Sequence, residues 1–316
     1  LSVAARAIST FSPLPAFSGV KIEATMDCLI LTGSDSDISI QTKLKKSEHC
    51  VLEIHDMGSI VIEAKYILEI VRKIDADEIE FEMLDGSLTK ISGNTAEFRI
   101  NGMRASEYPA IDFSKPNECF NVSEDILKKI ILQTSFATSD KETRPVLTGV
   151  NFQCKEHQLH CVATDSYRLA KKTVEIEESL NFNITIPAKS LQEVVKTLEG
   201  EGDVEIAVND KKAQFIIHDT IVQTRLIDGV YPETSRLIPL QFDYELTIDA
   251  HDLLNAIDRA SFIKNDGVSV IKFNLSEQEC VLSSKSVEVG SSTEVLSSAS
   301  FSGNALEISC NGRYVF

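Results

Sequence analysis

The chain has 316 residues, of which 43% are hydrophobic and 25% charged, a balance typical of soluble globular proteins and not of disordered ones. No apolar run approaches the roughly 20 residues that a membrane helix needs, and no basic-then-apolar leader opens the chain, so we expect a cytoplasmic protein. The net charge of −17 argues against a nucleic-acid ligand unless the basic residues gather on one face.

The seven cysteines are scattered along the chain. They form no Cys-x-x-Cys pair and no Cys/His cluster with the spacing of zinc ligands. This pattern indicates free thiols in a reducing compartment, where cysteine packs as a small apolar residue. The sequence therefore predicts neither a metal site nor a cofactor.

In chain order, the first strong pattern is a helix over residues 64–74, and it recurs over residues 188–198. Apolar residues in both have the i, i+3, i+4, i+7 spacing of one buried helix face, and Leu191 follows Ile67 by 124 residues. A strand-like alternation precedes each helix. Gly200 stands where the second helix could end in a left-handed cap.

Further matches have nearly the same offset. The Tyr-Pro pair at residues 231–232 follows the pair at 108–109 by 123 residues. A third and weaker copy begins with a helix over residues 249–263, which matches a helix that Ser123 would cap. Offsets that drift by so little indicate one repeated fold with altered loops.

Each unit reads helix, strands, helix, strands, which predicts an α+β fold with two helices packed on antiparallel sheets. Polar and proline-containing segments at 112–119 and 239–243 separate the units. We therefore expect three domains, at residues 1–115, 116–240 and 241–316. By the register of the repeat, the chain starts partway through the first opening helix and stops inside the second helix of the third domain, which is incomplete.

Residues 162–170, Val-Ala-Thr-Asp-Ser-Tyr-Arg-Leu-Ala, place an aromatic ring, a guanidinium and an aliphatic group side by side. Thr164, Asp165 and Ser166 are typical of turns in which short polar side chains bond the backbone. Taken alone, the stretch indicates two strands around a turn, with one Arg in a surface ion pair.

Three segments together carry a family resemblance. Arg-Pro-Val-Leu-Thr-Gly-Val at 144–150, Ala-Thr-Asp-Ser-Tyr-Arg-Leu at 163–169 and Asp-Gly-Val-Tyr-Pro-Glu-Thr-Ser-Arg-Leu-Ile-Pro at 228–239 closely resemble the bacterial DNA polymerase III beta subunit, the sliding clamp. Leu-Thr-Gly-Ser-Asp at 31–35 fits the first domain of that family. The resemblance covers essentially the whole chain, and its variant looks like the clamps of Gram-positive bacteria.

The resemblance implies three similar domains and a head-to-tail homodimer that closes into a ring. Duplex DNA would pass through the ring without being read, and the ring would confer processivity without catalysis. It implies, as partners, a clamp loader, a DNA polymerase III alpha or PolC-type polymerase, and repair enzymes and other proteins with a clamp-binding motif. The third unit lacks the last strands and the tail that complete the family's peptide cleft, on which ring closure and peptide binding would depend.

The peptide cleft of the family lies between the second and third domains. The positions that match it are Leu147, Thr164, Ser166, Tyr167, Arg168, Leu169, Pro232, Arg236 and Leu237. An apolar pocket with a few polar anchors suits an extended peptide bearing Leu or Phe. The leucines could equally be core, whereas a buried guanidinium needs partners and is harder to explain in that way. The family often has His where Tyr167 stands.

Basic residues lie off the apolar stripes of the repeated helices and in one loop. We expect the following to face DNA: Lys65, Arg72, Lys73, Lys128, Lys129, Lys141, Arg144, Lys189, Lys196, Arg259 and Lys264. Contacts of this kind reach phosphates and give weak, salt-dependent binding, as a sliding ring requires. The alternative is that these are ordinary solvated helix faces.

The ring interface of the family joins the first domain of one chain to the third domain of the other. Phe98 and Ile100 on one side, and Phe262 and Ile263 on the other, match the positions that become buried there. Such a contact would also remove two exposed sheet edges. On pattern alone, Phe262 could equally belong to the core of its own domain.

Two other functions compete with that of a sliding clamp. A peptide-binding scaffold without a DNA role would not need basic residues on the helices of every unit. A hydrolase would need a clustered nucleophile or acid–base set, and the sequence has no Gly-rich phosphate loop, zinc spacing or Gly-x-Ser-x-Gly elbow. The sequence therefore predicts a non-enzymatic sliding clamp.

Overall fold

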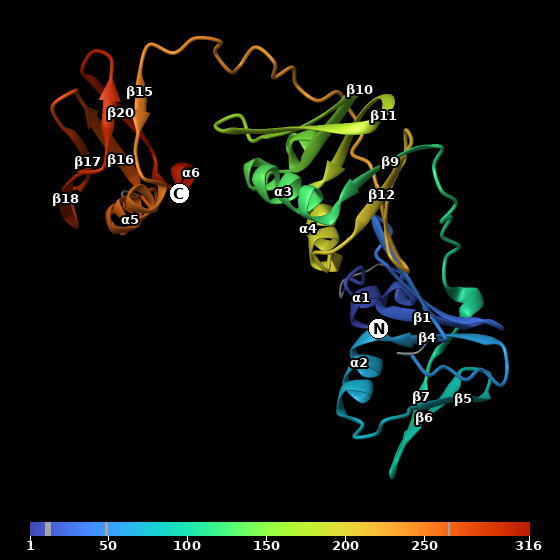
Figure 1. The fold of residues 1–316 in the computed structure, drawn as a ribbon. Helices are drawn as coiled ribbons and strands as arrows, with labels where there is room; N and C mark the ends of the chain where they lie inside the picture. The colour runs from blue at the N-terminus through green and yellow to red at the C-terminus, as the bar shows by residue number, and fades with distance from the viewer. Residues whose placement is uncertain (10–13, 48–49, 265) are drawn as a thin grey trace. The chain divides into compact units, whose positions relative to one another are not determined.

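The computed structural model describes residues 1–9, 14–47, 50–264 and 266–316, which form two compact units, Leu1–Tyr231 and Pro232–Phe316 (Figure 1). Among the described residues, no helix is both long and apolar enough to span a membrane.

In the part of the first repeat that the structure describes there are two helices, two short 3-10 turns and eight strands. In chain order these are α1 (Ser2–Ala5), η1 (Pro15–Ser18), β1 (Gly19–Ala24), β2 (Cys28–Ser34), β3 (Ile38–Lys45), β4 (Gly58–Glu63), α2 (Ala64–Lys73), β5 (Glu80–Asp85), β6 (Leu88–Gly93), β7 (Ala96–Asn101), β8 (Met103–Arg104) and η2 (Ala105–Glu107).

The second and third repeats follow the same order. The second consists of β9 (Glu118–Ser123), α3 (Glu124–Thr134), η3 (Ser135–Ala137), η4 (Pro145–Thr148), β10 (Gly149–Thr164), β11 (Leu169–Pro187), α4 (Ala188–Thr197), β12 (Asp203–Val208), β13 (Lys212–Ile217) and β14 (Thr220–Arg225). The third consists of β15 (Glu245–Thr247), α5 (Ala250–Ser261), β16 (Val270–Leu275), β17 (Cys280–Ser286), β18 (Gly290–Val295), β19 (Ser300–Ser302), β20 (Leu306–Asn311) and α6 (Gly312–Val315).

The predicted repetition is confirmed. The second helix of each repeat begins at Ala64, Ala188 and Gly312, and the strand order β4-β1-β2-β3 of the first repeat returns as β20-β16-β17-β18 in the third. In the second repeat the same four strands are fused into the long hairpin of β10 and β11, in which Gly149 pairs with Pro187 and Thr164 with Leu169. The chain is therefore α+β, as expected.

The helix boundaries agree with the expected caps except at one end. The Ser123 side chain accepts a hydrogen bond from the N–H of Ile126 at the start of α3, as predicted. Gly200 has a left-handed φ of 96°, but it does not cap α4 as predicted, because α4 ends at Thr197 and Leu198 leaves it in an extended conformation. The carboxylate of Glu124 is buried and accepts the N–H groups of Glu199 and Gly200, at 2.7 and 2.6 Å, so it holds the loop in another path.

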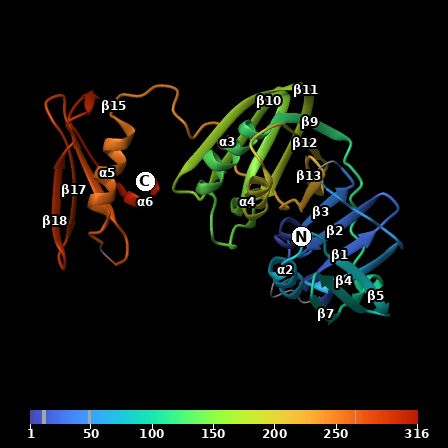
Figure 2. The same ribbon diagram turned by 60° about the horizontal axis from the view of Figure 1, so that its bottom comes forward.

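Within the described residues, the first two repeats share one nine-stranded sheet. β3 pairs with β14 across the junction, where Ile40 stands opposite Val222, and both side chains are fully buried. Ile38, Ile40 and Ala7 belong to the hydrophobic core of the second repeat although they come from the first. The helices α1 to α4 lie along one side of this unit and the sheet strands along the other (Figures 1 and 2). Joined cores make these two repeats one body.

A strap formed by residues 112–115 crosses from the first repeat to the second. Lys212 donates through Nζ to the carbonyl of Asp112 at 2.7 Å and to its carboxylate at 3.1 Å, and Gln214 donates to the carbonyl of Ser114 at 3.1 Å. The hydroxyl and N–H of Ser114, together with Lys212, lower the pKa of Asp112 to about 2. These hydrogen bonds attach the strap to β13.

Asp112→Asn should make the free energy of unfolding less sensitive to acidic pH. Because the pKa of Asp112 in the folded protein lies below its ordinary value of 3.8, its carboxylate stabilises the fold above that pH and loses this contribution as the pH falls towards about 2. Urea unfolding between about pH 5 and pH 2 should show a smaller loss of unfolding free energy for Asp112→Asn than for the unchanged protein. Asp210→Asn, which removes an exposed carboxylate nearby, is the control, and equal acid dependence in all three proteins would contradict the assignment.

Candidate functional site

The turn between β10 and β11 is fixed by its own side chains. One oxygen of Asp165, Oδ1, accepts the N–H groups of Tyr167 and Arg168 at 2.9 and 3.0 Å. The other, Oδ2, accepts from Nε of Arg168 at 3.0 Å. Thr164 donates its hydroxyl to the carbonyl of Arg168 at 2.6 Å, and Ser166 takes a left-handed φ of 78°. The expected turn and ion pair are therefore both present.

An apolar floor lies under this turn. Leu147, Val162 and Tyr231 are buried together, and Val146 and Leu169 pack against them. The hydroxyl oxygen of Tyr231 accepts the N–H of Thr164 at 3.0 Å, and burial raises the pKa of Tyr231 to about 12. The tyrosine therefore fastens the turn to the floor from below.

Above the floor lie two exposed aromatic rings, Tyr167 and Phe136, and the guanidinium of Arg168. Tyr167 is 80% exposed, and Phe136, from the end of the preceding helical segment, is 54% exposed. The guanidinium carbon of Arg168 lies 5.6 Å from the centroid of the Phe136 ring. Arg144 donates to the hydroxyl of Ser166 at 3.5 Å, so a residue predicted to face DNA lies beside the turn.

The structure brings together the predicted cleft residues that belong to the first unit. Leu147 and Thr164 are buried, Leu169 is half-buried, and the turn residues lie around them. Pro232, Arg236 and Leu237 are exposed residues of the second unit, and their contact with the turn stays a prediction. Phe136 and Tyr231 were missed as parts of this site, although the recurring Tyr-Pro pair was a signal for the tyrosine.

The first repeat contains the same turn in another role. Asp35 accepts the N–H groups of Asp37 and Ile38 at 3.0 and 2.9 Å, and Ser36 has a φ of 86°. There, Ile38 is buried in the core at the junction with the second repeat. The position equivalent to Ile38 carries Arg168 in the second repeat. The same turn therefore places a core residue, Ile38, at the junction between repeats in the first case, and the cation Arg168 in the second.

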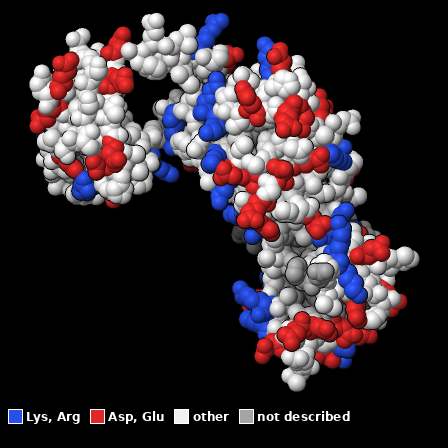
Figure 3. Space-filling model, in the orientation of Figure 1, with Lys and Arg blue, Asp and Glu red and all other residues white. Residues whose placement is uncertain are grey.

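All of the predicted DNA-facing residues are exposed. Figure 3 shows Lys and Arg over α2, α3 and α4 on the left of the first unit, with a further group over β1 and many acidic residues between them. Several of these cations have an acidic neighbour, in the pairs Lys65–Glu63, Arg72–Glu69, Lys73–Glu69, Lys129–Asp125, Lys196–Glu193 and Arg259–Glu294. Exposed pairs of this kind contribute only about 0–1 kcal/mol, so they can be exchanged for phosphate.

The other predicted DNA-facing residues make no ion pair with any residue that the structure describes. They are Lys128, Lys141, Arg144, Lys189 and Lys264. Their positive charge is not neutralised locally, which makes them the strongest candidates for phosphate contacts.

The predicted interface residues differ in exposure. Phe98 lies on the edge strand β7 and is 37% exposed, while Ile100, on the same strand, is half-buried. Phe262 is 68% exposed at the end of α5. Ile263 is 2% exposed within its own unit, so its side chain is not on the surface.

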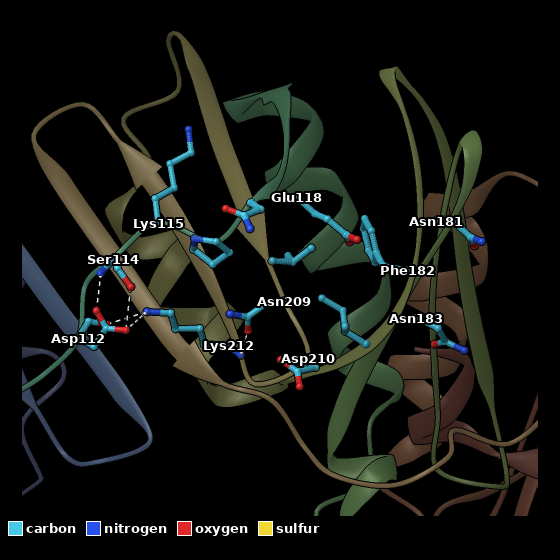
Figure 4. Close-up of a pocket in the computed structure, with 14 residues that line it drawn as sticks. Asp112, Ser114, Lys115, Glu118, Asn181, Phe182, Asn183, Asn209, Asp210 and Lys212 are labelled. Carbon is cyan, nitrogen blue, oxygen red and sulfur yellow. Dashed lines mark hydrogen bonds and ion pairs between the residues drawn. The ribbon is translucent and has the colours of Figure 1, made fainter.

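A polar cavity of about 540 Å³ lies apart from these residues, beside the strap (Figure 4). Its lining residues are Asp112, Ser114, Lys115, Pro116, Asn117, Glu118, Asn181, Phe182, Asn183, Ile184, Val208, Asn209, Asp210 and Lys212. Both lysines are already engaged, Lys212 with Asp112 and Lys115 with Glu205. No residue predicted from the sequence lines this cavity.

Tyr231→Phe should destabilise the protein by about 1–3 kcal/mol, because the buried N–H of Thr164 loses its acceptor. Tyr108→Phe is the matched control, since Tyr108 is the equivalent tyrosine of the first repeat and its buried hydroxyl has no partner among the described residues. Its loss should be neutral or slightly stabilising. Denaturant unfolding measures both, and equal effects would contradict the role given to Tyr231.

Comparison with known proteins finds matches to a single family along the whole chain. Three family models match in order: the N-terminal domain of the DNA polymerase III beta subunit at residues 1–112, its central domain at 121–233 and its C-terminal domain at 235–316. The beta sliding clamp of Bacillus subtilis is 37% identical over 98% of this chain and 84% of its own length. That of Staphylococcus aureus is 35% identical, with the same coverage.

Solved structures agree with the sequence comparison. The Bacillus subtilis sliding clamp matches with a TM-score of 0.95 and 36% identity, over 99% of this chain and 84% of that one. The beta chain of Streptococcus pneumoniae matches with a TM-score of 0.95 and 31% identity, over 99% and 85%. A clamp from Bartonella birtlesii, bound to griselimycin, matches with a TM-score of 0.90 and 28% identity, over 99% and 84%. The chain therefore belongs to the DNA polymerase III beta subunit family, the sliding clamps.

Proposed function

We propose that this protein works as a ring of two copies that encircles duplex DNA, slides along it without reading sequence, and tethers replicative polymerase and repair enzymes in the cytoplasm. The ring acts through position and has no catalytic site of its own. The observation that carries the proposal is the match to sliding clamps along the whole of a chain built from three repeats. Its clamp domains are residues 1–115, 116–240 and 241–316.

The DNA contact is assigned to the exposed basic residues of the repeated helices. A protein that slides should touch phosphates and leave the base edges alone, because base contacts would fix its position. Lys128 and Lys189 lie on helices of one repeat and have no acidic partner among the described residues, while Lys129 and Lys196 on the same helices are paired. This mixture gives weak contacts that exchange readily, which suits sliding better than tight binding.

The double variant Lys128→Gln/Lys189→Gln should lower the salt dependence of DNA binding. Each phosphate contact that is lost reduces the slope of log K against log salt by about 0.9, so the pair should reduce it by about 2. Binding of the full chain to a short duplex, followed by fluorescence anisotropy at low salt, measures the slope. Lys155→Gln/Lys211→Gln makes the same change of charge at exposed lysines off the helices and should leave it unaltered. If the control changes as much, the DNA-facing assignment fails.

The closed ring is assigned to two sheet edges that have no partner strand among the described residues. β7 is the edge of the β5-β6-β7 sheet, and β18 is the edge of the sheet formed by β18, β17, β16 and β20. By the repeat, β7 corresponds to β14 and β18 to β3, the two strands that pair at the junction inside the chain. The internal junction is thus a template for β7 of one copy pairing with β18 of the other, with Phe98, Ile100, Phe262 and Ile263 at or beneath the contact.

Phe98→Asp should convert the dimer into a monomer, because it places a charge where the two edges would meet. Phe81→Asp is the matched control: Phe81 is on the same face of the same sheet, opposite Ile91, but on its other edge. The two phenylalanines are similarly exposed, at 37% and 41%. Sedimentation velocity of the full chain should give a dimer for the unchanged protein and for Phe81→Asp. A monomer in both variants, or in neither, would contradict the assignment.

Partner proteins are assigned to the turn between β10 and β11, with Pro232, Arg236 and Leu237 completing the cleft. We expect the clamp loader, the DNA polymerase III alpha or PolC-type polymerase and other proteins with a clamp-binding motif to dock there. The apolar floor would receive a Leu or Phe side chain, and Arg168 would donate to a peptide oxygen. The griselimycin complex of the Bartonella birtlesii clamp supports a ligand site in this family.

A further inference from the structure

We propose that Asp165 and Phe136 are positioning residues, which hold the guanidinium of Arg168 ready for the carbonyl or carboxylate oxygen of a bound peptide. The inference rests on the proposed peptide cleft and assigns within it two residues that do not themselves need to touch the peptide. This positioning role applies to the turn of the second repeat and not to the equivalent turn of the first.

Asp165 uses its two carboxylate oxygens for different purposes. Oδ1 bonds the backbone N–H groups of Tyr167 and Arg168 and shapes the turn, while Oδ2 bonds Nε of Arg168 at 3.0 Å. The side chains of Arg168 and Asp165 are only 23% and 13% exposed, so this pair is less screened by water than the ion pairs on the helices. A charge-assisted bond of this kind is roughly twice as strong as a neutral one, so it restricts where the guanidinium can lie.

Phe136 restricts the same group from a second direction. Its ring is 54% exposed, so it contributes little to the core, yet the guanidinium carbon lies 5.6 Å from its centroid. A cation held over an aromatic face is attracted by the negative face of the ring. With its Nε bonded to a carboxylate and its guanidinium carbon near an aromatic ring, Arg168 loses less side-chain freedom when a peptide binds.

The first repeat shows that the second oxygen has a separate role. Asp35 builds the same turn through Oδ1, and Oδ2 of Asp35 makes no hydrogen bond with any residue described by the structure. The position that carries Arg168 is Ile38 there, so no guanidinium is present to be held. Oδ1 therefore shapes the turn in both repeats, whereas Oδ2 of Asp165 holds Arg168 and has no such role in the first repeat.

The variant Asp165→Asn separates these two roles. The amide keeps an oxygen for the turn, and it replaces Oδ2 by an NH2 group that cannot accept from Nε of Arg168. Phe136→Leu removes the ring but keeps an apolar side chain. We expect each variant to weaken the binding of a fluorescent peptide from the clamp-binding motif of the PolC-type polymerase by roughly 3- to 10-fold. Asp35→Asn, the matched control, should change the affinity less than about 2-fold, within the effect of a surface substitution.

A double-mutant cycle tests whether Asp165 acts through Arg168. In an Arg168→Ala background, Asp165→Asn should produce no further loss, because the group that it holds is gone. The same loss in both backgrounds would show a general effect on the turn and would overturn the inference, as would unchanged affinity in Asp165→Asn and Phe136→Leu. If Arg168→Ala itself binds the peptide normally, the proposed cleft fails together with this inference.

Discussion

Pairing between open sheet edges is the constraint on which this architecture depends. Each repeat has helices on one side and sheets with free edges, and a free edge exposes backbone groups that need partners. Inside the chain the edge of β3 meets β14, and Ile38 and Ile40 complete the core of the next repeat. The first two repeats therefore share a core and are not independent folding units. β7 and β18 are likewise edge strands among the described residues, and in the proposed ring a second copy of the chain would pair with them.

The electrostatics follow from a compromise between two needs. A net charge of −17 makes most of the surface repulsive to DNA, whereas the repeated helices carry several exposed lysines and arginines. Many of these cations are held loosely by neighbours such as Glu69 and Glu193. An exposed ion pair is weak and is screened by salt, so a passing phosphate can replace the carboxylate and later release the lysine. The same weakness that makes these pairs poor stabilisers makes them suitable for sliding.

The repeats, the helix starts and the turn at Asp165 could be predicted because they depend on local spacing and capping. The end of α4 could not, because the buried carboxylate of Glu124 reaches it from another helix, 75 residues away in the sequence. The same holds for Phe136 and Tyr231, whose roles arise only when distant segments meet at the turn. Burial of Ile263 beside the exposed Phe262 could not be read from a pattern that gave both residues the same weight. Tertiary contacts, not propensity, decided each of these.

The central claim is that the protein is held on DNA by its topology. Its most direct test is to load the full chain with its clamp loader onto a nicked circular plasmid, separate bound from free protein by gel filtration, and then linearise the plasmid. The account predicts that the protein stays on the circle and leaves once the DNA has ends. Protein that never elutes with the circle, or that remains on linear DNA, would contradict the sliding ring.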